Sequence, residues 1–200
     1  MSSIEIINVL EKSKALGFLG PGPVEDHVVH ALKYNNELSN IENSWIIDLG
    51  TGGGIPALPL LFENDELKIH MVDSSKKRCA FLMWAITELS LAGRARVTCI
   101  RAEEFGSNPD NRHKYSAVVA RSFGPPSTTL ECAAPLITVG GICIISEPPN
   151  FRKWPDEGLK ELGLNKLDSD SSFAVFQSFE QCRSELPRTA KAMKSNPIFG

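Results

Sequence analysis

Two acidic residues and a run of glycines in the first half of the chain have the spacing of a site for a nucleoside cofactor. An apolar run ends at Asp48, glycines follow at positions 50, 52, 53 and 54, and a second apolar run ends at Asp73, 19 residues after Gly54. Glycines let backbone N–H groups approach a ligand, and a helix N-terminus favours an anion. An acid that ends the next strand can accept hydrogen bonds from ribose hydroxyls. We therefore expect a nucleoside cofactor across the ends of two parallel strands.

The glycine spacing alone leaves two cofactors open. From Gly52 the chain reads G-x-G-x-x-A through Ala57, a permitted variant of the dinucleotide fingerprint, so a nicotinamide cofactor is not excluded. Asp48 favours the other cofactor, because an acid just before the first glycine resembles the first motif of class I S-adenosylmethionine (SAM) methyltransferases. There the loop wraps the methionine and ribose end of SAM. The predicted SAM-binding residues of this loop are Asp48, Gly50, Thr51, Gly52, Gly54 and Ile55.

Two later strand ends carry further candidates. The third apolar run leads into Ala102 and Glu103, whose backbone and carboxylate are placed to meet an adenine edge. The competing interpretation is a surface acid pair that opens a helix. The fourth apolar run, SAVVA, ends at Arg121, at the edge of an open α/β sheet where ligands bind.

Alternating strands and helices must position these residues, which predicts a parallel sheet covered by helices. We expect strands at 45–49, 68–72, 96–100, 117–120, 141–146 and 171–179, the last antiparallel to a segment near 163–167. We expect helices at 2–15, 24–34, 56–62, 76–91 and 127–136. The inward positions should include Ile4, Ile7, Val9 and Leu10 on the first helix, Val28, Val29 and Leu32 on the second, and Cys79, Leu82, Met83, Ile86 and Leu89 on the fourth.

Composition narrows the class of protein. Two hundred residues, 42% of them hydrophobic, suit one globular domain, with a helical lead-in over 1–40 and a basic tail over 183–200. No apolar run reaches the length of a membrane span, and the acidic N-terminus is not typical of a signal peptide. Five scattered cysteines indicate reduced thiols and a cytoplasmic location, and the four histidines suggest no metal site. The net charge of −3 means that any nucleic-acid binding needs a local basic patch.

The segments DLGTGGGIP, MVDSSKKRCAFL, RAEEF and VVARSF, in this order, resemble the bacterial small-subunit rRNA guanine-N7 methyltransferases, also called glucose-inhibited division protein B proteins. The resemblance covers about residues 24–146 and the basic tail. GFLGPGPVEDH, ARSFGPP and SEPP look closer to an actinobacterial-type branch of that family. The implied fold is the class I SAM-dependent methyltransferase fold, Rossmann-like, with a mostly parallel seven-stranded sheet, an antiparallel last strand and N-terminal helices.

The resemblance implies roles for single residues. Gly50 and Ile55 match the first motif, Asp73 the ribose acid, Ala102 and Glu103 the adenine pair, and Arg121 an arginine near the methyl-transfer site and the cofactor. Two departures put the target nucleotide in doubt. Glu147-Pro148 stands where the family commonly has lysine-glycine, and Ala57-Leu58 follows Pro56 where it often has proline-glycine.

The sequence therefore predicts a SAM-dependent methyltransferase, a monomer, acting on a guanine N7 of small-subunit rRNA, free or in the assembled subunit. N7 carries a lone pair and no proton, so alignment matters more than a general base. Phosphate contacts are expected from four cations of the tail, Arg183, Arg188, Lys191 and Lys194. The alternatives are a small-molecule methyltransferase with the same cofactor site, an inactive SAM- or RNA-binding homologue, and a nicotinamide oxidoreductase.

Overall fold

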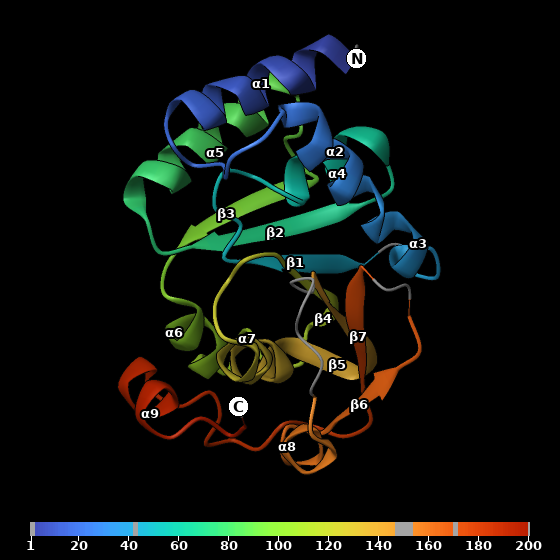
Figure 1. The fold of residues 1–200 in the computed structure, drawn as a ribbon, viewed down its shortest axis with the longest axis vertical. Coiled ribbons are helices and arrows are strands. Elements are labelled where there is room, and N and C mark those ends of the chain that lie inside the picture. Colours follow the sequence, from blue (N-terminus) through green and yellow to red (C-terminus); the bar gives the residue numbers. More distant parts are fainter. Residues whose placement is uncertain (1–2, 42–43, 147–153, 170–171, 200) are drawn as a thin grey trace. The chain divides into compact units, whose positions relative to one another are not determined.

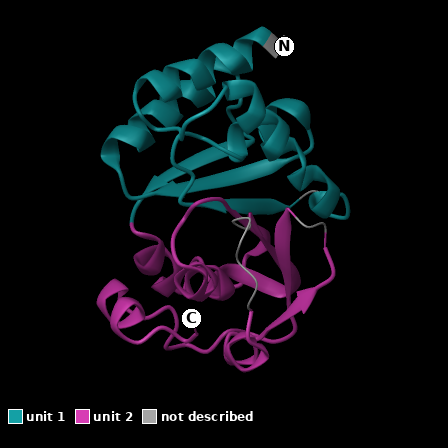
Figure 2. Ribbon diagram, viewed as in Figure 1, with its two compact units in different colours: residues 1–100 teal, residues 101–200 magenta. Residues whose placement is uncertain are grey.

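The computed structural model of the protein describes residues 3–41, 44–146, 154–169 and 172–199. Contacts along the chain divide it into two compact units, residues 1–100 and residues 101–200 (Figure 2). We describe each unit by itself. The single domain that the sequence indicates stays a prediction.

The first unit contains a parallel sheet with the strand order β3-β2-β1, made of β1 (Trp45–Leu49), β2 (Lys68–Asp73) and β3 (Ala95–Cys99) (Figure 1). The strand register pairs Leu49 with Val72, and Asp73 with Cys99. The carboxyl ends of β1 and β2 therefore lie side by side, and they bring the glycine loop close to Asp73, as the sequence predicts.

The described residues of the first unit also form five helices: α1 (Ser3–Ala15), α2 (Val24–Leu32), α3 (Tyr34–Leu38), α4 (Ala57–Glu63) and α5 (Lys76–Glu88). The helix α1 packs against α2, α4 and α5 (Figure 1). The N-terminal lead-in is therefore built into the helical layer of this unit. The short helix α3 was not expected from the sequence.

Three inward positions predicted from apolar periodicity are wrong. Ile4 is 68% exposed and Val29 is 61% exposed, and Met83 also faces solvent. The buried stripe of α1 is Ile6, Val9, Leu10 and Ser13, and that of α2 is Val24, His27 and Ala31. Each stripe contains one polar residue that has a hydrogen-bond partner. A pattern based on apolar residues alone therefore does not show which side of the helix is buried.

In the part of the second unit that the structure describes, four strands lie in the order β4-β5-β7-β6: β4 (Tyr115–Ala120), β5 (Ile137–Ser146), β6 (Leu164–Leu167) and β7 (Phe173–Ser178) (Figure 1). β4 and β5 are parallel, whereas β7 is antiparallel to both β5 and β6. The antiparallel last strand is thus confirmed, and seven strands are described in all.

The helices of the second unit are α6 (Ala102–Ser107), α7 (Pro126–Ala133), the 3-10 turn η1 (Ala134–Leu136), α8 (Asp156–Glu161) and α9 (Ala190–Ser195). The sequence predicted only the helix at 127–136, which the structure divides between α7 and η1. In the part of the chain that the structure describes, no helix is both long enough and apolar enough to cross a membrane.

Candidate cofactor site and C-terminal tail

The glycine loop folds back from the end of β1 onto the end of β2. The backbone N–H groups of Gly50 and Thr51 both donate to the carbonyl of Val72, at 2.8 and 3.1 Å. The next N–H, from Gly52, donates to Oδ2 of Asp73 at 2.9 Å. Gly50 and Gly52 have φ angles of +72° and +59°, which side chains with a Cβ rarely adopt. The loop geometry therefore depends on its glycines.

Asp48 supports the shape of this loop from beneath. Its carboxylate is 1% exposed. Oδ2 accepts a short hydrogen bond from the Thr51 hydroxyl and another from the backbone N–H of Ala57 at 3.3 Å. One carboxylate thus joins the end of β1, the middle of the loop and the first residue of α4. Direct contact of Asp48 and Thr51 with a cofactor stays a prediction.

Asp73 is held in a fixed orientation by backbone donors. It is 5% exposed, its Oδ1 accepts from the backbone N–H of Ser75 at 2.8 Å, and its Oδ2 accepts from Gly52. Nη1 of Arg78, in the first turn of α5, lies 3.6 Å from Oδ2. A carboxylate can accept about four hydrogen bonds, more than these two N–H contacts require. The orientation suits a residue that also binds a hydroxyl donor.

Three residues near the glycine loop lie in the hydrophobic core of the first unit. Ile55 is buried, and so is the departure Ala57-Leu58. A Cβ on Gly54 would come within 2.4 Å of Cδ1 of Leu58, so the loop packs tightly on the first turn of α4. This departure from the family pattern therefore lies in the packing under the loop. The other departure, Glu147-Pro148, lies outside the described residues.

In the second unit, the predicted adenine pair opens a helix. Ala102 is the buried first residue of α6, and Oε1 of Glu103 accepts from Nε of Arg101 at 2.9 Å. This hydrogen bond raises the pKa of Arg101 above its usual value. This geometry agrees with the competing interpretation from the sequence, in which a pair of acids opens a helix. The adenine contact stays a prediction.

Arg121 directly follows β4, at the carboxyl end of a parallel strand, as predicted. Its side chain is half-buried, and the next residue, Ser122, has a φ angle of +52°. A non-glycine residue in this region of backbone space is uncommon. The chain therefore turns sharply just after Arg121, which ends the strand there. The role of Arg121 in methyl transfer stays a prediction.

The basic tail is folded, and its best-buried cation is engaged inside the protein. Glu131 on α7 is 0% exposed, and its two carboxylate oxygens accept from Nε and Nη2 of Arg188 at 2.8 and 2.7 Å. The backbone N–H of Arg188 donates to the same carboxylate at 2.9 Å. This bidentate geometry gives Arg188 a structural contact that differs from the phosphate contact expected from the sequence.

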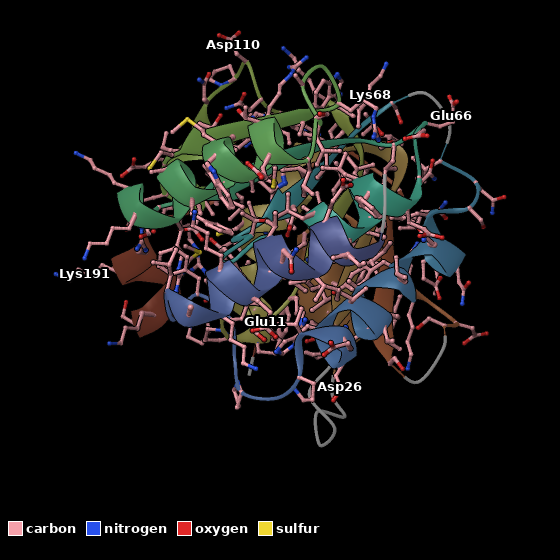
Figure 3. The ribbon with its side chains drawn as sticks, turned by 90° about the horizontal axis from the view of Figure 1, so that it is seen from above. Glu11, Asp26, Glu66, Lys68, Asp110 and Lys191 are labelled. Carbon is pink, nitrogen blue, oxygen red and sulfur yellow. The ribbon has the colours of Figure 1, made fainter. Side chains whose placement is uncertain are left out.

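The other three cations of the tail are exposed. Arg183 already forms ion pairs with Glu161 and Glu185, at 2.6 and 3.7 Å. Lys191 and Lys194 lie on α9, and the side chain of Lys191 extends outward from that helix (Figure 3). The two lysines are therefore the tail residues best placed for the predicted phosphate contacts.

Arg112 attaches the start of the tail through main-chain atoms. Its guanidinium donates to the carbonyls of Cys182 at 3.0 Å and Arg183 at 2.9 Å, and also to the carbonyl of Leu186. A further bond, at 3.3 Å, reaches the carbonyl of Gly106 at the end of α6. The segment from Cys182 to Leu186 is thus tied to α6 by one side chain.

Sequence reasoning missed the roles of Glu131 and Arg112 in holding the tail. A signal for Glu131 did exist, because a single acid stands in the otherwise apolar stretch that runs from Leu130 to Leu136. An acid in such a run is buried only when it is paired. Arg112 lies in a polar segment and offers no comparable signal.

Comparisons with known proteins agree with this architecture. Residues 22–147 match the family model GidB, described as rRNA small subunit methyltransferase G. A protein of Acetivibrio thermocellus named ribosomal RNA small subunit methyltransferase G is 34% identical over 170 residues, covering 78% of this chain and 69% of the relative.

Solved structures support the fold alone, because their sequence identities are low. The cyclase SpnF superposes with a TM-score of 0.61 at 18% identity, covering 82% of this chain and 70% of SpnF. A putative methylase from Haemophilus influenzae superposes with a TM-score of 0.59 at 14% identity, covering 76% of this chain and 89% of the methylase. The class I methyltransferase fold is therefore confirmed. With the family model spanning more than half of its residues, the chain belongs to the rRNA small subunit methyltransferase G family.

Proposed function

We propose that this protein transfers the methyl group of SAM to N7 of a guanine in small-subunit rRNA. The main support is the contact between the glycine loop and Asp73, in a chain whose residues 22–147 match the methyltransferase G family. That contact joins the ends of β1 and β2, where a nucleoside cofactor is expected.

The residues of the first unit fit SAM. Asp73 is a shielded acid with acceptor capacity for ribose hydroxyls, and the loop from Gly50 to Gly54 offers backbone groups to the methionine end. A Cβ placed on Gly52 would meet its nearest neighbour only at 3.8 Å, so this side of the loop is open. When bound, SAM supplies an electrophilic methyl group on its sulfonium.

The proposed reaction asks for alignment of the base more than for proton transfer. Guanine N7 has a lone pair and no proton to lose, so correct placement supplies most of the rate enhancement. Arg121 is proposed to donate to guanine O6 or to stack on the ring, which its planar guanidinium allows. The base must first be taken out of its stack, as for other enzymes that modify bases.

Binding of rRNA is assigned to the exposed side of the tail, chiefly Lys191 and Lys194. Single-stranded RNA elements are recognised through their phosphates and splayed bases. The actinobacterial-type branch, the monomeric state and the cytoplasmic location remain predictions that accompany this proposal.

Two experiments test the proposal. The first maps methylated nucleotides in rRNA from cells with and without the protein, and one N7-methylguanine should disappear with it. The second measures cofactor binding by calorimetry. SAM should bind and NADH should not, because Asp48 favours a SAM site and residues 22–147 match a methyltransferase family. Tight NADH binding without SAM binding would refute the assignment.

A matched pair of variants locates the cofactor. Asp73→Ala should weaken SAM binding by about 1–3 kcal/mol, the usual value of hydrogen bonds to a charged acceptor. Asp65→Ala is the control, because it removes an exposed carboxylate of the same unit, 3.1 Å from Arg94, outside the loop. The control should bind SAM like the wild type. Equal effects of both variants would remove Asp73 from the cofactor site.

A further inference from the structure

The end of α1 contacts the glycine loop through three residues that we call the N-terminal brace: Ser13, Phe18 and Leu19. The hydroxyl of Ser13 is fully buried and donates to the carbonyl of Gly53 at 2.9 Å, across 40 residues of sequence. Donation of this kind fixes the peptide that follows Gly53. The brace thus acts on the middle of the predicted cofactor loop.

The same contact is tight on its other sides. A Cβ built on Gly53 would lie 2.4 Å from Oγ of Ser13, 2.6 Å from Cδ2 of Leu19 and 2.9 Å from the carbonyl oxygen of Phe18. At distances below 3.0 Å the neighbouring atoms would have to shift to admit a methyl group, and one of them, the carbonyl oxygen of Phe18, belongs to the backbone. Glycine at position 53 is therefore required by the brace, whereas Gly50 and Gly52 are required by their φ angles.

The geometry of the brace comes from the way α1 ends. Gly17 has a φ angle of +72°, its N–H donates to the carbonyl of Lys14 at 2.9 Å, and the N–H of Phe18 donates to the carbonyl of Ser13 at 3.0 Å. These two bonds are those of a Schellman motif, in which glycine takes the left-handed position after the helix. The motif turns Phe18 and Leu19 back over the glycine loop.

Aromatic contacts keep the brace against α5. The rings of Phe18 and Phe81 lie 5.8 Å apart in an edge-to-face arrangement, and Nζ of Lys12 lies 3.6 Å from the centre of the Trp84 ring. Because α5 begins just after Asp73, α1 is fixed to the same element that follows the ribose acid. Movement of the brace and of the cofactor loop must therefore be coupled.

We propose that Ser13 and the Schellman turn at Gly17 are positioning elements of the cofactor site, which hold the glycine loop so that Gly52 meets Asp73. The brace touches the loop and not the reacting atoms. This inference rests on the proposed function, because it requires that the glycine loop binds SAM.

The test measures binding of S-adenosylhomocysteine by calorimetry to two variants with matched controls. Ser13→Ala removes the hydrogen bond to Gly53, and Ser178→Ala removes a similar bond, from the buried Ser178 hydroxyl to the carbonyl of Glu180 at 3.0 Å, in the second unit. Both should lower thermal stability to a similar degree. Only Ser13→Ala should raise Kd, by at most about tenfold, because the lost bond orders the loop and does not contact the ligand.

The second pair perturbs only the backbone. Gly17→Ala and Gly93→Ala each place a Cβ at a positive φ, +72° and +89°, with no atom within 4 Å of it. The strain is similar, but only Gly17 lies in the brace. Gly17→Ala should therefore raise Kd while Gly93→Ala should not. Single-turnover methylation of rRNA at saturating SAM should stay within about twofold of wild type, because positioning of the loop affects binding and not the aligned base.

A measurement on the wild-type protein covers the case in which a variant does not fold. Binding of S-adenosylhomocysteine should slow hydrogen exchange at the Phe18 amide, whose acceptor is the Ser13 carbonyl. Unchanged exchange there, or equal Kd values for Ser13→Ala and wild type, would overturn the brace alone. Failure of the wild type to bind S-adenosylhomocysteine or SAM would overturn the proposed function as well.

Discussion

Substitution of Arg188 tests the structural role of the tail. Arg188→Ala removes two hydrogen bonds to Glu131, of 2.8 and 2.7 Å. The Glu131 carboxylate, which is 0% exposed, then keeps the hydrogen bond from the backbone N–H of residue 188. Removing one partner of a buried ion pair costs about 3–5 kcal/mol. For a chain of this size each kcal/mol lowers Tm by about 2–4 °C, so Tm should fall by roughly 6–20 °C.

Arg183→Ala is the matched control in the same tail. The partners of Arg183, Glu161 and Glu185, are exposed, and such surface pairs contribute about 0.2–1 kcal/mol. Urea unfolding of the wild type, Arg188→Ala and Arg183→Ala gives the loss in free energy of unfolding for each variant.

A double variant tests the cause of the destabilisation. In Glu131→Leu/Arg188→Met, both charges of the buried pair are replaced by apolar groups, which is often neutral or stabilising. The double variant should therefore recover part of the stability lost in Arg188→Ala, since the backbone N–H of residue 188 still loses its acceptor. A loss below about 1 kcal/mol in Arg188→Ala, or no recovery in the double variant, would refute the reasoning from burial.

Three further predictions concern the lysines of the tail, Arg121, and His70, which is a buried residue of β2. Lys191→Gln with Lys194→Gln should reduce the salt dependence of rRNA binding, by a slope of about 0.7 for each lost contact to a single strand, and should leave SAM affinity unchanged; an unaltered slope in a salt titration would remove both lysines from the interface. Arg121→Lys should keep the fold and lower the single-turnover methylation rate on the order of a hundredfold, since lysine lacks the planar guanidinium, and a near wild-type rate would exclude it from the active site. Burial, together with the charge of Arg96, lowers the pKa of His70 from its ordinary value of 6.5 to about 4. The unfolded chain therefore binds the extra proton between these pH values, and stability should fall as pH drops from 6.5 towards 4; in His70→Gln, urea unfolding across that range should show a shallower decline.

The parallel pairing of the first strands and the glycine loop between them were predictable because short sequence signals determine both, whereas the order of the strands was not predicted. Asp48 and Asp73 each end an apolar run, and parallel strands bring such ends to one edge of the sheet. The contact between Gly52 and Asp73 follows from that arrangement. A local pattern that is compatible with one structure, such as an apolar run that ends in an acid, can therefore be interpreted from a single sequence.

Side-chain burial was less predictable because polar residues occupy core positions. His27 is buried on α2, where Nε2 lies 3.2 Å from the carbonyl of Gly20, and Val29 on the opposite side faces solvent. A prediction based on hydrophobicity places Val29 in the core and His27 in solvent. The partner that makes burial of His27 acceptable comes from a loop, and the sequence does not show that pairing.

The tail shows the same limit over a longer distance. Arg188 and Glu131 are 57 residues apart, and nothing in the composition of the tail distinguishes Arg188 from Lys191. Only the structure shows that one cation is engaged internally while the other extends into solvent. A basic segment in a sequence therefore overstates the number of cations available to RNA.

The attachment of the tail by Arg112 has a consequence for how this surface can diversify. The guanidinium of Arg112 donates to the backbone carbonyls of residues 182, 183 and 186. Every amino acid has such a carbonyl. These hydrogen bonds therefore do not depend on which side chains the three residues carry. Substitution of an exposed residue such as Arg183 would leave these hydrogen bonds in place, so the outward side chains of the tail can vary while its attachment is kept.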